Sequence, residues 1–204
     1  MAATDNNRSK EELSQAILHT ASRLFTEHGI EAVSMHQIAK CAGIGQGTLY
    51  RRYANKADLC MEMMHDHFEH FRTDIESYLS DFKHENPKVK IRSVVSFIIR
   101  FLELKSKWLQ VIQSQQLNEG MKNGEEFFHS LPYQFLHGVF TRLLKEGAPA
   151  TAIRSKNAEF IAHSYISILS PYTCMHLANA KGYTSGQVEE EFGDSFVDPL
   201  FVHE

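Results

Sequence analysis

The side chains best suited to chemistry lie between positions 40 and 56, where basic residues occur without a single acidic one. The basic residues are Lys40, Arg51, Arg52 and Lys56. The same segment holds Gln46, Thr48 and Tyr50, whose side chains can hydrogen-bond to phosphate oxygens or to base edges. A basic segment of this kind is typical of a surface that binds nucleic acid.

The charge of the whole chain makes this segment distinctive. The 204 residues carry a formal net charge of -4. Residues 1–60 hold seven Lys and Arg against six Asp and Glu, whereas residues 61–204 hold 14 against 19. An acidic chain is a poor general coat for nucleic acid, so any binding to DNA has to be local.

Two short helices are expected to position the basic segment. Ser34 and Gln37 form a capping box, and Val33 and Ile38 occupy the two positions of a hydrophobic staple, so one helix should begin near residue 35. Gly43 should end it after about two turns.

The second short helix is expected over residues 46–53. Ile44 and Leu49 repeat the staple around a cap at Gly45. Gly47 removes a side chain where the backbone would have to come close to DNA, and the helix N-terminus offers free N–H groups to phosphate. Two short helices joined by a tight turn form a helix-turn-helix, whose second helix enters the major groove.

Apolar residues at helical spacing predict helices along almost the whole chain, and strand-like alternation is rare. A capping box of Ser9 and Glu12 predicts a first helix that ends at Gly29. Further helices are expected over residues 56–82, 87–102, 108–121, 131–146, 155–181 and 185–196, with a kink at Pro171. The chain is therefore predicted to be all-α.

Residues 13–60 combine apolar, glycine and hydroxyl positions at a distinctive spacing. They are Ile17, Leu18, Ala21, Leu24, Phe25, Gly29, Ser34, Ile38, Ala39, Ala42, Gly43, Ile44, Gly47, Thr48, Leu49, Tyr50, Tyr53, Lys56 and Leu59. This pattern resembles the DNA-binding signature of the TetR family. The resemblance implies a homodimer in which an N-terminal three-helix helix-turn-helix DNA-binding domain (1–54) is joined by a long helix to a C-terminal helical ligand-binding and dimerisation domain (55–204).

The predicted DNA-binding residues come from both short helices and from the start of the long one. They are Ser34, His36, Gln46, Gly47, Thr48, Tyr50, Arg51, Arg52, Tyr53 and Lys56. Two alternatives stay open: Tyr50 could be half-buried, and the basic run could be an ordinary solvated surface. Gly45, Gln46 and the Arg52-Tyr53 pair depart from the residues common in the family, which implies an operator specific to this protein.

Aromatic and aliphatic residues of the C-terminal half could line an apolar ligand cavity. They are Phe97, Phe101, Leu104, Trp108, Phe135, Val139 and Phe140. The alternative is ordinary core, because aromatic stripes at helical spacing need no ligand to explain them. The resemblance implies a small-molecule inducer, and these residues favour an apolar or aromatic one. It also implies that the last two long helices form the homodimer.

Histidines crowd one stretch of the expected long helix, where His65, His67 and His70 lie with Asp66 and Glu62. Only some of these pairs have the three- or four-residue spacing of ligands on one helix face, so no metal and no cofactor is predicted. A protein of the same fold that is regulated by a metal or by a protein partner stays the alternative.

Enzyme activity finds no support, because the sequence has no G-x-S-x-G, P-loop, H-E-x-x-H or Gly-rich nucleotide-binding turn. The three cysteines are widely spaced and odd in number, and no apolar run approaches the roughly 18 residues of a membrane span. The sequence therefore predicts a cytoplasmic repressor that binds double-stranded operator DNA, contacts no membrane, and is released by a small molecule.

Overall fold

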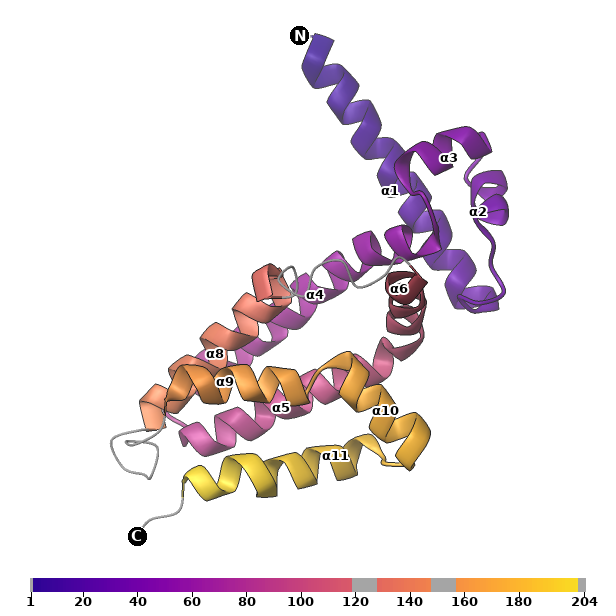
Figure 1. Cartoon of the computed structure of the whole chain (residues 1–204). Helices are drawn as coiled ribbons and strands as arrows, with labels where there is room; N and C mark the ends of the chain where they lie inside the picture. Colours follow the sequence, from indigo (N-terminus) through magenta and orange to yellow (C-terminus); the bar gives the residue numbers. More distant parts are fainter. Residues whose placement is uncertain (1, 119–127, 148–156, 202–204) are drawn as a thin grey trace. The chain divides into compact units, whose positions relative to one another are not determined.

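The structure is a computed structural model that describes residues 2–118, 128–147 and 157–201, with side chains described for 11–114, 128–147 and 157–201. Every regular element in these ranges is helical, and none is a strand (Figure 1). The all-α prediction is confirmed. Among the described residues, no helix combines the length and the apolar character that crossing a bilayer requires.

In chain order, the described helices are α1 (Ala2–His28), α2 (Met35–Cys41), α3 (Gln46–Arg52), α4 (Lys56–Asp81), α5 (Pro87–Leu104), α6 (Ser106–Asn118), α8 (Leu131–Gly147), α9 (Ala158–Ile168), α10 (Pro171–Lys181) and α11 (Ser185–Phe192). After α11 come a π-helical turn over Gly193–Val197 and a 3₁₀ turn over Asp198–Leu200.

Two predicted helix boundaries were wrong. The first helix begins at Ala2 instead of after Ser9. Residues that can form a capping box do not start a new helix where the chain is already helical before them. One kinked helix was predicted over 155–181, but its described part, 157–181, forms two helices, because the Ser170 hydroxyl accepts a hydrogen bond from the Thr173 N–H and Pro171 starts α10. Residues 119–121 and 155–156, which were assigned to predicted helices, lie outside the described residues.

The chain divides into two compact units, Met1–Asp66 with Gln110–Asn118, and His67–Leu109 with Glu119–Glu204. In the first unit, α2 packs against both α1 and α3. Helix α4 runs without a break from the first unit into the second. The predicted division of domains at residues 54 and 55 stays a prediction.

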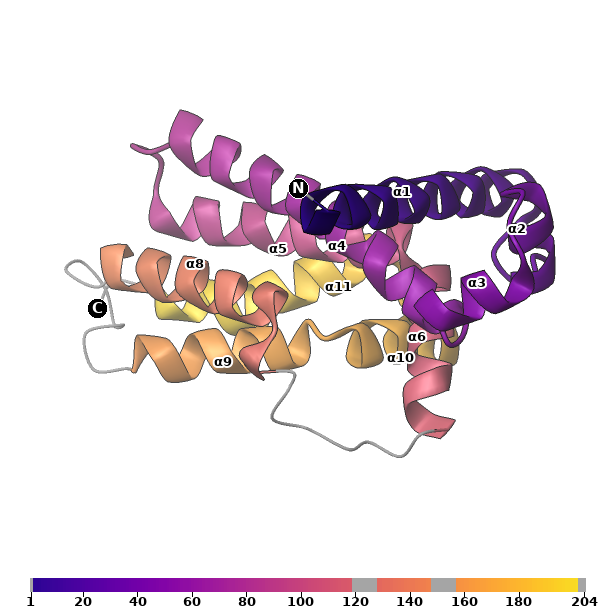
Figure 2. The same cartoon turned by 90° about the horizontal axis from the view of Figure 1, so that it is seen from above.

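The second unit is built on α5, α8 and α9. Helix α8 lies beside α9 (Figure 2), and both α8 and α11 pack on α5. Its core includes Ile91, Val94, Phe140, Leu144 and Tyr165, all buried. At about 25 cal/mol per Å² of apolar surface removed from water, such side chains supply most of the driving force for folding of this unit.

Ion pairs connect α5 to the turns that follow α11. The Arg92 guanidinium pairs with Asp194 and Asp198, and the Lys88 ammonium lies 2.8 Å from the Asp198 carboxylate. Hydrogen bonds from Arg92 and Lys88 hold the pKa of the Asp198 carboxyl below its ordinary value. A Cβ at Gly193 would overlap the Arg92 guanidinium, so a larger residue would force this side chain to shift within the ion pair.

Candidate nucleic-acid interface

The connection into α2 has the predicted capping box. The Ser34 hydroxyl accepts a hydrogen bond from the Gln37 N–H at 3.2 Å, and the Gln37 side-chain oxygen accepts one from the Ser34 N–H at 2.8 Å. Val33 and Ile38, the staple pair, are both buried. The start of α2 is therefore fixed by contacts within five residues of sequence.

The turn between α2 and α3 depends on a glycine. Gly43 has φ +68°, in the left-handed region that favours glycine. The Ile44 N–H then donates to the Ala39 carbonyl at 3.0 Å, which closes the turn after α2. The predicted helix-turn-helix geometry of α2 and α3 is thus present.

The inner side of α3 is held by two residues four positions apart. Leu49 has no exposed surface, and Tyr53, which follows the helix, is 2% exposed. The Tyr53 hydroxyl lies 3.4 Å from the Ser14 hydroxyl of α1, and burial raises the pKa of Tyr53. Tyr53 was predicted to touch DNA; its burial corrects that expectation, because a side chain in the core of the first unit cannot reach a phosphate.

The outer side of α3 carries exposed polar side chains that can form hydrogen bonds. Gln46, Gly47, Tyr50 and Arg51 follow one another at the spacing of one helix face and are all exposed. Tyr50 is 48% exposed, so the half-buried tyrosine that the sequence left open as an alternative is not what the structure has. This exposed face of α3 offers an amide, a hydroxyl and a guanidinium, and no carboxylate.

The neighbouring side of α3 adds a second group of polar side chains. The Arg51 guanidinium donates to the half-buried Thr48 hydroxyl at 3.2 Å, and Arg52 is exposed. The first turn of α3 contains no acidic residue, and both arginines stand in its last turn. Free N–H groups of the first turn and two arginines together give this surface a positive potential.

Gly47 has no role in packing within the chain. It has no left-handed backbone conformation, and a Cβ built on it would meet nothing within 4 Å. The fold itself would therefore accept alanine at this position. A glycine that its own fold does not require is consistent with a partner that approaches the backbone closely.

Some of the predicted residues are already engaged inside the chain. The Ser34 hydroxyl is used in the cap of α2, and the His36 ring nitrogen Nδ1 lies within hydrogen-bond distance of the Gln46 side-chain amide. The Lys56 ammonium donates to the Ile30 carbonyl oxygen at 2.8 Å, with the Glu31 carbonyl oxygen at 3.5 Å. Lys56 is half-buried, so part of its role is to hold the segment that follows α1.

Sequence reasoning missed the His36–Gln46 and Ser14–Tyr53 contacts. One of them had a signal: Ser14 adjoins the apolar stripe of α1 and is 5% exposed, and a buried hydroxyl needs a partner. The His36–Gln46 contact joins two different helices, and spacing along one helix cannot show it.

The seven predicted ligand-binding residues do not share one environment. Val139 and Phe140 are buried in the core, the alternative that the sequence left open, whereas Leu104 is 68% exposed. The side chains of Phe97, Phe101, Trp108 and Phe135 are half-buried.

The half-buried aromatic side chains pack on α4. The rings of Phe101 and Phe71 lie 4.7 Å apart between centroids, and those of Phe135 and Phe68 lie 6.0 Å apart. The ring of Trp108 meets His67 edge-on at 5.5 Å. These contacts supply an aromatic surface beside α4 without bringing all seven residues together.

The histidine-rich stretch of α4 does not assemble ligands. Across residues 2–118, 128–147 and 157–201, no three His, Cys, Asp or Glu side chains come together as a metal would need. Of the three histidines in this stretch, His67 is half-buried and His65 and His70 are exposed.

Comparisons with known sequences agree with the helix-turn-helix geometry. Residues 17–63 match the profile of the family described as bacterial regulatory proteins, tetR family. An HTH-type transcriptional regulator of Staphylococcus aureus (strain USA300) is 34% identical over 131 residues, which is 64% of this chain. The match covers 66% of that regulator's own length, just under two thirds.

Comparisons with solved structures extend over nearly the whole chain. Thermus thermophilus FadR, a TetR family transcriptional repressor in complex with lauroyl-CoA, has a TM-score of 0.69 at 17% identity, over 94% of this chain and 96% of that one. AibR in complex with isovaleryl coenzyme A and operator DNA has a TM-score of 0.60 at 21% identity, over 93% and 100%. At these identities the likeness shows a common fold.

Proposed function

Because this chain belongs to the tetR family of bacterial regulatory proteins, as residues 17–63 show, we propose that it is a cytoplasmic repressor released from operator DNA by a small molecule. The exposed face of α3 is the observation that carries the proposal. Gln46, Tyr50 and Arg51 stand there without a carboxylate, above the buried Leu49.

The polar side chains of α3 are proposed to make two kinds of contact with DNA, to bases and to phosphates. An exposed Gln can make two hydrogen bonds to adenine, and an exposed Arg can make two to guanine, so Gln46 and Arg51 are the proposed base readers. Tyr50, Thr48 and Arg52 are proposed to contact phosphates, which fix the protein on the duplex without reading sequence. Gly47 allows the backbone to come close.

The operator is proposed to be an inverted repeat, because the regulator is expected to bind as a homodimer through its C-terminal helices. Two identical recognition helices then need half-sites about 10–10.5 base pairs apart, or a multiple of that spacing. Phe160 of α9 and Tyr172 of α10 are 69% and 48% exposed, which suits helices that pair with a second copy.

The ligand is proposed to be apolar or aromatic over part of its structure. The half-buried rings of Phe97, Phe101 and Phe135 offer a surface for such a group beside α4. Complexes of similar folds with lauroyl-CoA and isovaleryl coenzyme A make acyl thioesters of coenzyme A the first compounds to test. Ligand binding would favour a state whose recognition helices no longer match the half-site spacing.

The proposal is tested by recovering the fragments of its own genome that the purified protein retains. We expect a few fragments with a common inverted repeat, a dimeric mass by light scattering at micromolar concentration, and release of those fragments by an acyl thioester. Retention of no fragment above background would refute the regulator. Release by a metal or a protein, with no effect of any apolar compound, would replace the small-molecule ligand.

A further inference from the structure

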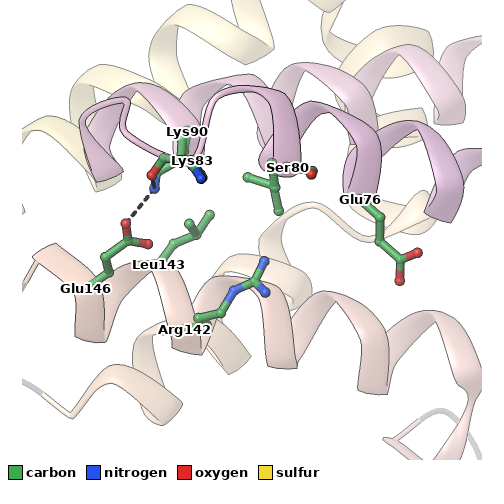
Figure 3. A pocket seen from close by; sticks show the side chains of 8 residues that line it. Glu76, Ser80, Lys83, Lys90, Arg142, Leu143 and Glu146 are labelled. Carbon is green, nitrogen blue, oxygen red and sulfur yellow. Dashed lines mark hydrogen bonds and ion pairs between the residues drawn. The ribbon is translucent and has the colours of Figure 1, made fainter.

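A cleft in the second unit is lined mainly by charged side chains. It has a volume of about 470 Å³ and lies between the C-terminal part of α4, the start of α5 and the end of α8 (Figure 3). Its lining residues are Glu76, Leu79, Ser80, Lys83, Lys90, Arg142, Leu143 and Glu146. None of them belongs to the seven apolar residues that the sequence predicted for a ligand.

Lys90 forms one wall of the cleft although it is a buried cation. Its side chain is 3% exposed, and its ammonium donates to the Glu146 carboxylate at 2.6 Å and to the Lys83 carbonyl oxygen at 3.2 Å. A buried charge is stable only when it is paired and hydrogen-bonded. These two contacts use two of the three N–H donors of Lys90 and neutralise Glu146.

Two further cations, Arg142 and Lys83, line the cleft. For the side chains of Arg142 and Lys83, no hydrogen bond or ion pair is found within the described ranges. The Arg142 guanidinium extends from α8 into the space below Ser80, and Glu76 stands at the far end from the Lys90–Glu146 pair (Figure 3). With Lys90 and Glu146 matched, the cleft holds two cations against one remaining carboxylate.

The floor of the cleft is apolar. Leu79 is 8% exposed and Leu143 is 1% exposed, and both belong to the hydrophobic core of the second unit. The cleft therefore combines a cationic rim with an apolar base. Its volume is within the roughly 300–1,000 Å³ of small-molecule sites, so it has room for an anionic group together with an adjoining apolar or neutral part.

We propose that this cleft binds the phosphate group of a small molecule, with Arg142 and Lys83 as the binding cations. A guanidinium presents paired N–H donors to phosphate oxygens, and a lysine adds a point charge. A phosphate monoester carries a charge of about −2 and several acceptor oxygens, so Arg142 and Lys83 can bind it together. The Ser80 hydroxyl and the third donor of Lys90 supply further hydrogen bonds.

The phosphate has two possible sources, free phosphate or the phosphates of a coenzyme A thioester. In the second case the inference rests on the proposed function, because the thioester is then the releasing ligand. Isothermal titration calorimetry on the full chain with inorganic phosphate, coenzyme A, lauroyl-CoA and laurate distinguishes the sources. Binding of inorganic phosphate but not of coenzyme A or lauroyl-CoA indicates the first source. Binding of coenzyme A and lauroyl-CoA but not of inorganic phosphate indicates the second.

Variants connect the binding to the cleft. We expect R142Q to weaken binding of the phosphate-bearing probe by at least about tenfold and K83Q/R142Q to weaken it further, whereas Arg142→Lys should retain most of it. Arg100 and Lys181 are exposed and do not line the cleft, so R100Q and K181Q are matched controls that should bind as the unaltered protein does. Equal urea midpoints for all variants would exclude misfolding.

Two results would overturn the inference for either source: no phosphate-bearing probe binds, or K83Q/R142Q binds the probe as tightly as the controls. For coenzyme A as the source, binding of laurate as tight as that of lauroyl-CoA would also overturn it. Operator binding is measured in parallel and should be unchanged by K83Q/R142Q in the absence of a probe. If the unaltered protein retains DNA and none of the phosphate-bearing probes binds, only the phosphate site fails. If it retains no DNA, the proposed function fails independently of the calorimetry.

Discussion

Gly47→Ala should raise the stability of the protein and weaken its binding to DNA. Gly47 is the second residue of α3, and its Cβ would meet nothing within 4 Å. Alanine in a helix is favoured over glycine by roughly 0.5–1 kcal/mol, and the lower end applies in the first turn. The substitution therefore costs the isolated protein nothing and should increase its free energy of unfolding.

The same methyl group should obstruct the DNA complex. One extra carbon in a close-packed contact costs about 1–3 kcal/mol, which corresponds to a Kd roughly 5- to 150-fold higher. Gly138→Ala is the matched control, because Gly138 lies inside α8 and its Cβ would also meet nothing within 4 Å. Gly138→Ala should stabilise the chain by a similar or larger amount and leave the Kd for operator DNA unchanged.

The measurements are urea unfolding and fluorescence anisotropy with a retained DNA fragment. Unchanged affinity in Gly47→Ala would refute the close approach of the α3 backbone to DNA. Lower stability in Gly47→Ala would refute the open space around this residue. A similar loss of affinity in Gly138→Ala would show that helix stability, and not contact at Gly47, governs DNA binding.

Three further predictions concern Tyr53, Arg52 and Asp198. Tyr53→Phe removes the buried hydroxyl beside Ser14 and should lower the free energy of unfolding by about 0.5–1.5 kcal/mol without changing operator affinity; weaker binding at unchanged stability would return Tyr53 to the DNA-contacting residues. Arg52→Ala should reduce the slope of log Kd against log salt by about one, whereas Arg100→Ala should not, and equal slopes would remove Arg52 from the phosphate contacts. Arg92 holds the pKa of the Asp198 carboxyl below its ordinary value of 3.8. The ionised carboxylate therefore stabilises the folded chain at pH above 3.8, and this contribution is lost as the pH falls through the folded pKa. Asp198→Asn should therefore unfold at lower urea than the unaltered chain at neutral pH and at the same urea in strong acid; a difference that persists in strong acid would contradict this.

The sequence predicted α2, its turn and α3 well because their determinants are local. The capping box of Ser34 and Gln37 and the left-handed Gly43 act within a few residues. The prediction for Tyr53 was wrong although a signal existed, since Tyr53 follows the buried Leu49 by four residues and so lies on the inner side of α3.

Features of the second unit depend on residues far apart in the chain. Lys90 and Glu146 are 56 positions apart, and Arg92 and Asp198 are 106 apart. No periodicity connects such residues, so neither the ion pairs nor the charged cleft could be predicted from spacing. Aromatic stripes predict burial equally for core and for ligand contact, and the sequence could not separate Phe140 in the core from Phe101 at its edge.

The central claim is that the exposed face of α3 reads the bases of an operator. It is tested most directly by comparing the duplexes that the unaltered protein and Gln46→Ala select from a random-sequence pool. We predict an inverted repeat for the unaltered protein, and for Gln46→Ala the same repeat with the preference lost at one symmetric pair of positions. No enriched duplex, or identical preferences for both proteins at every position, would contradict the claim.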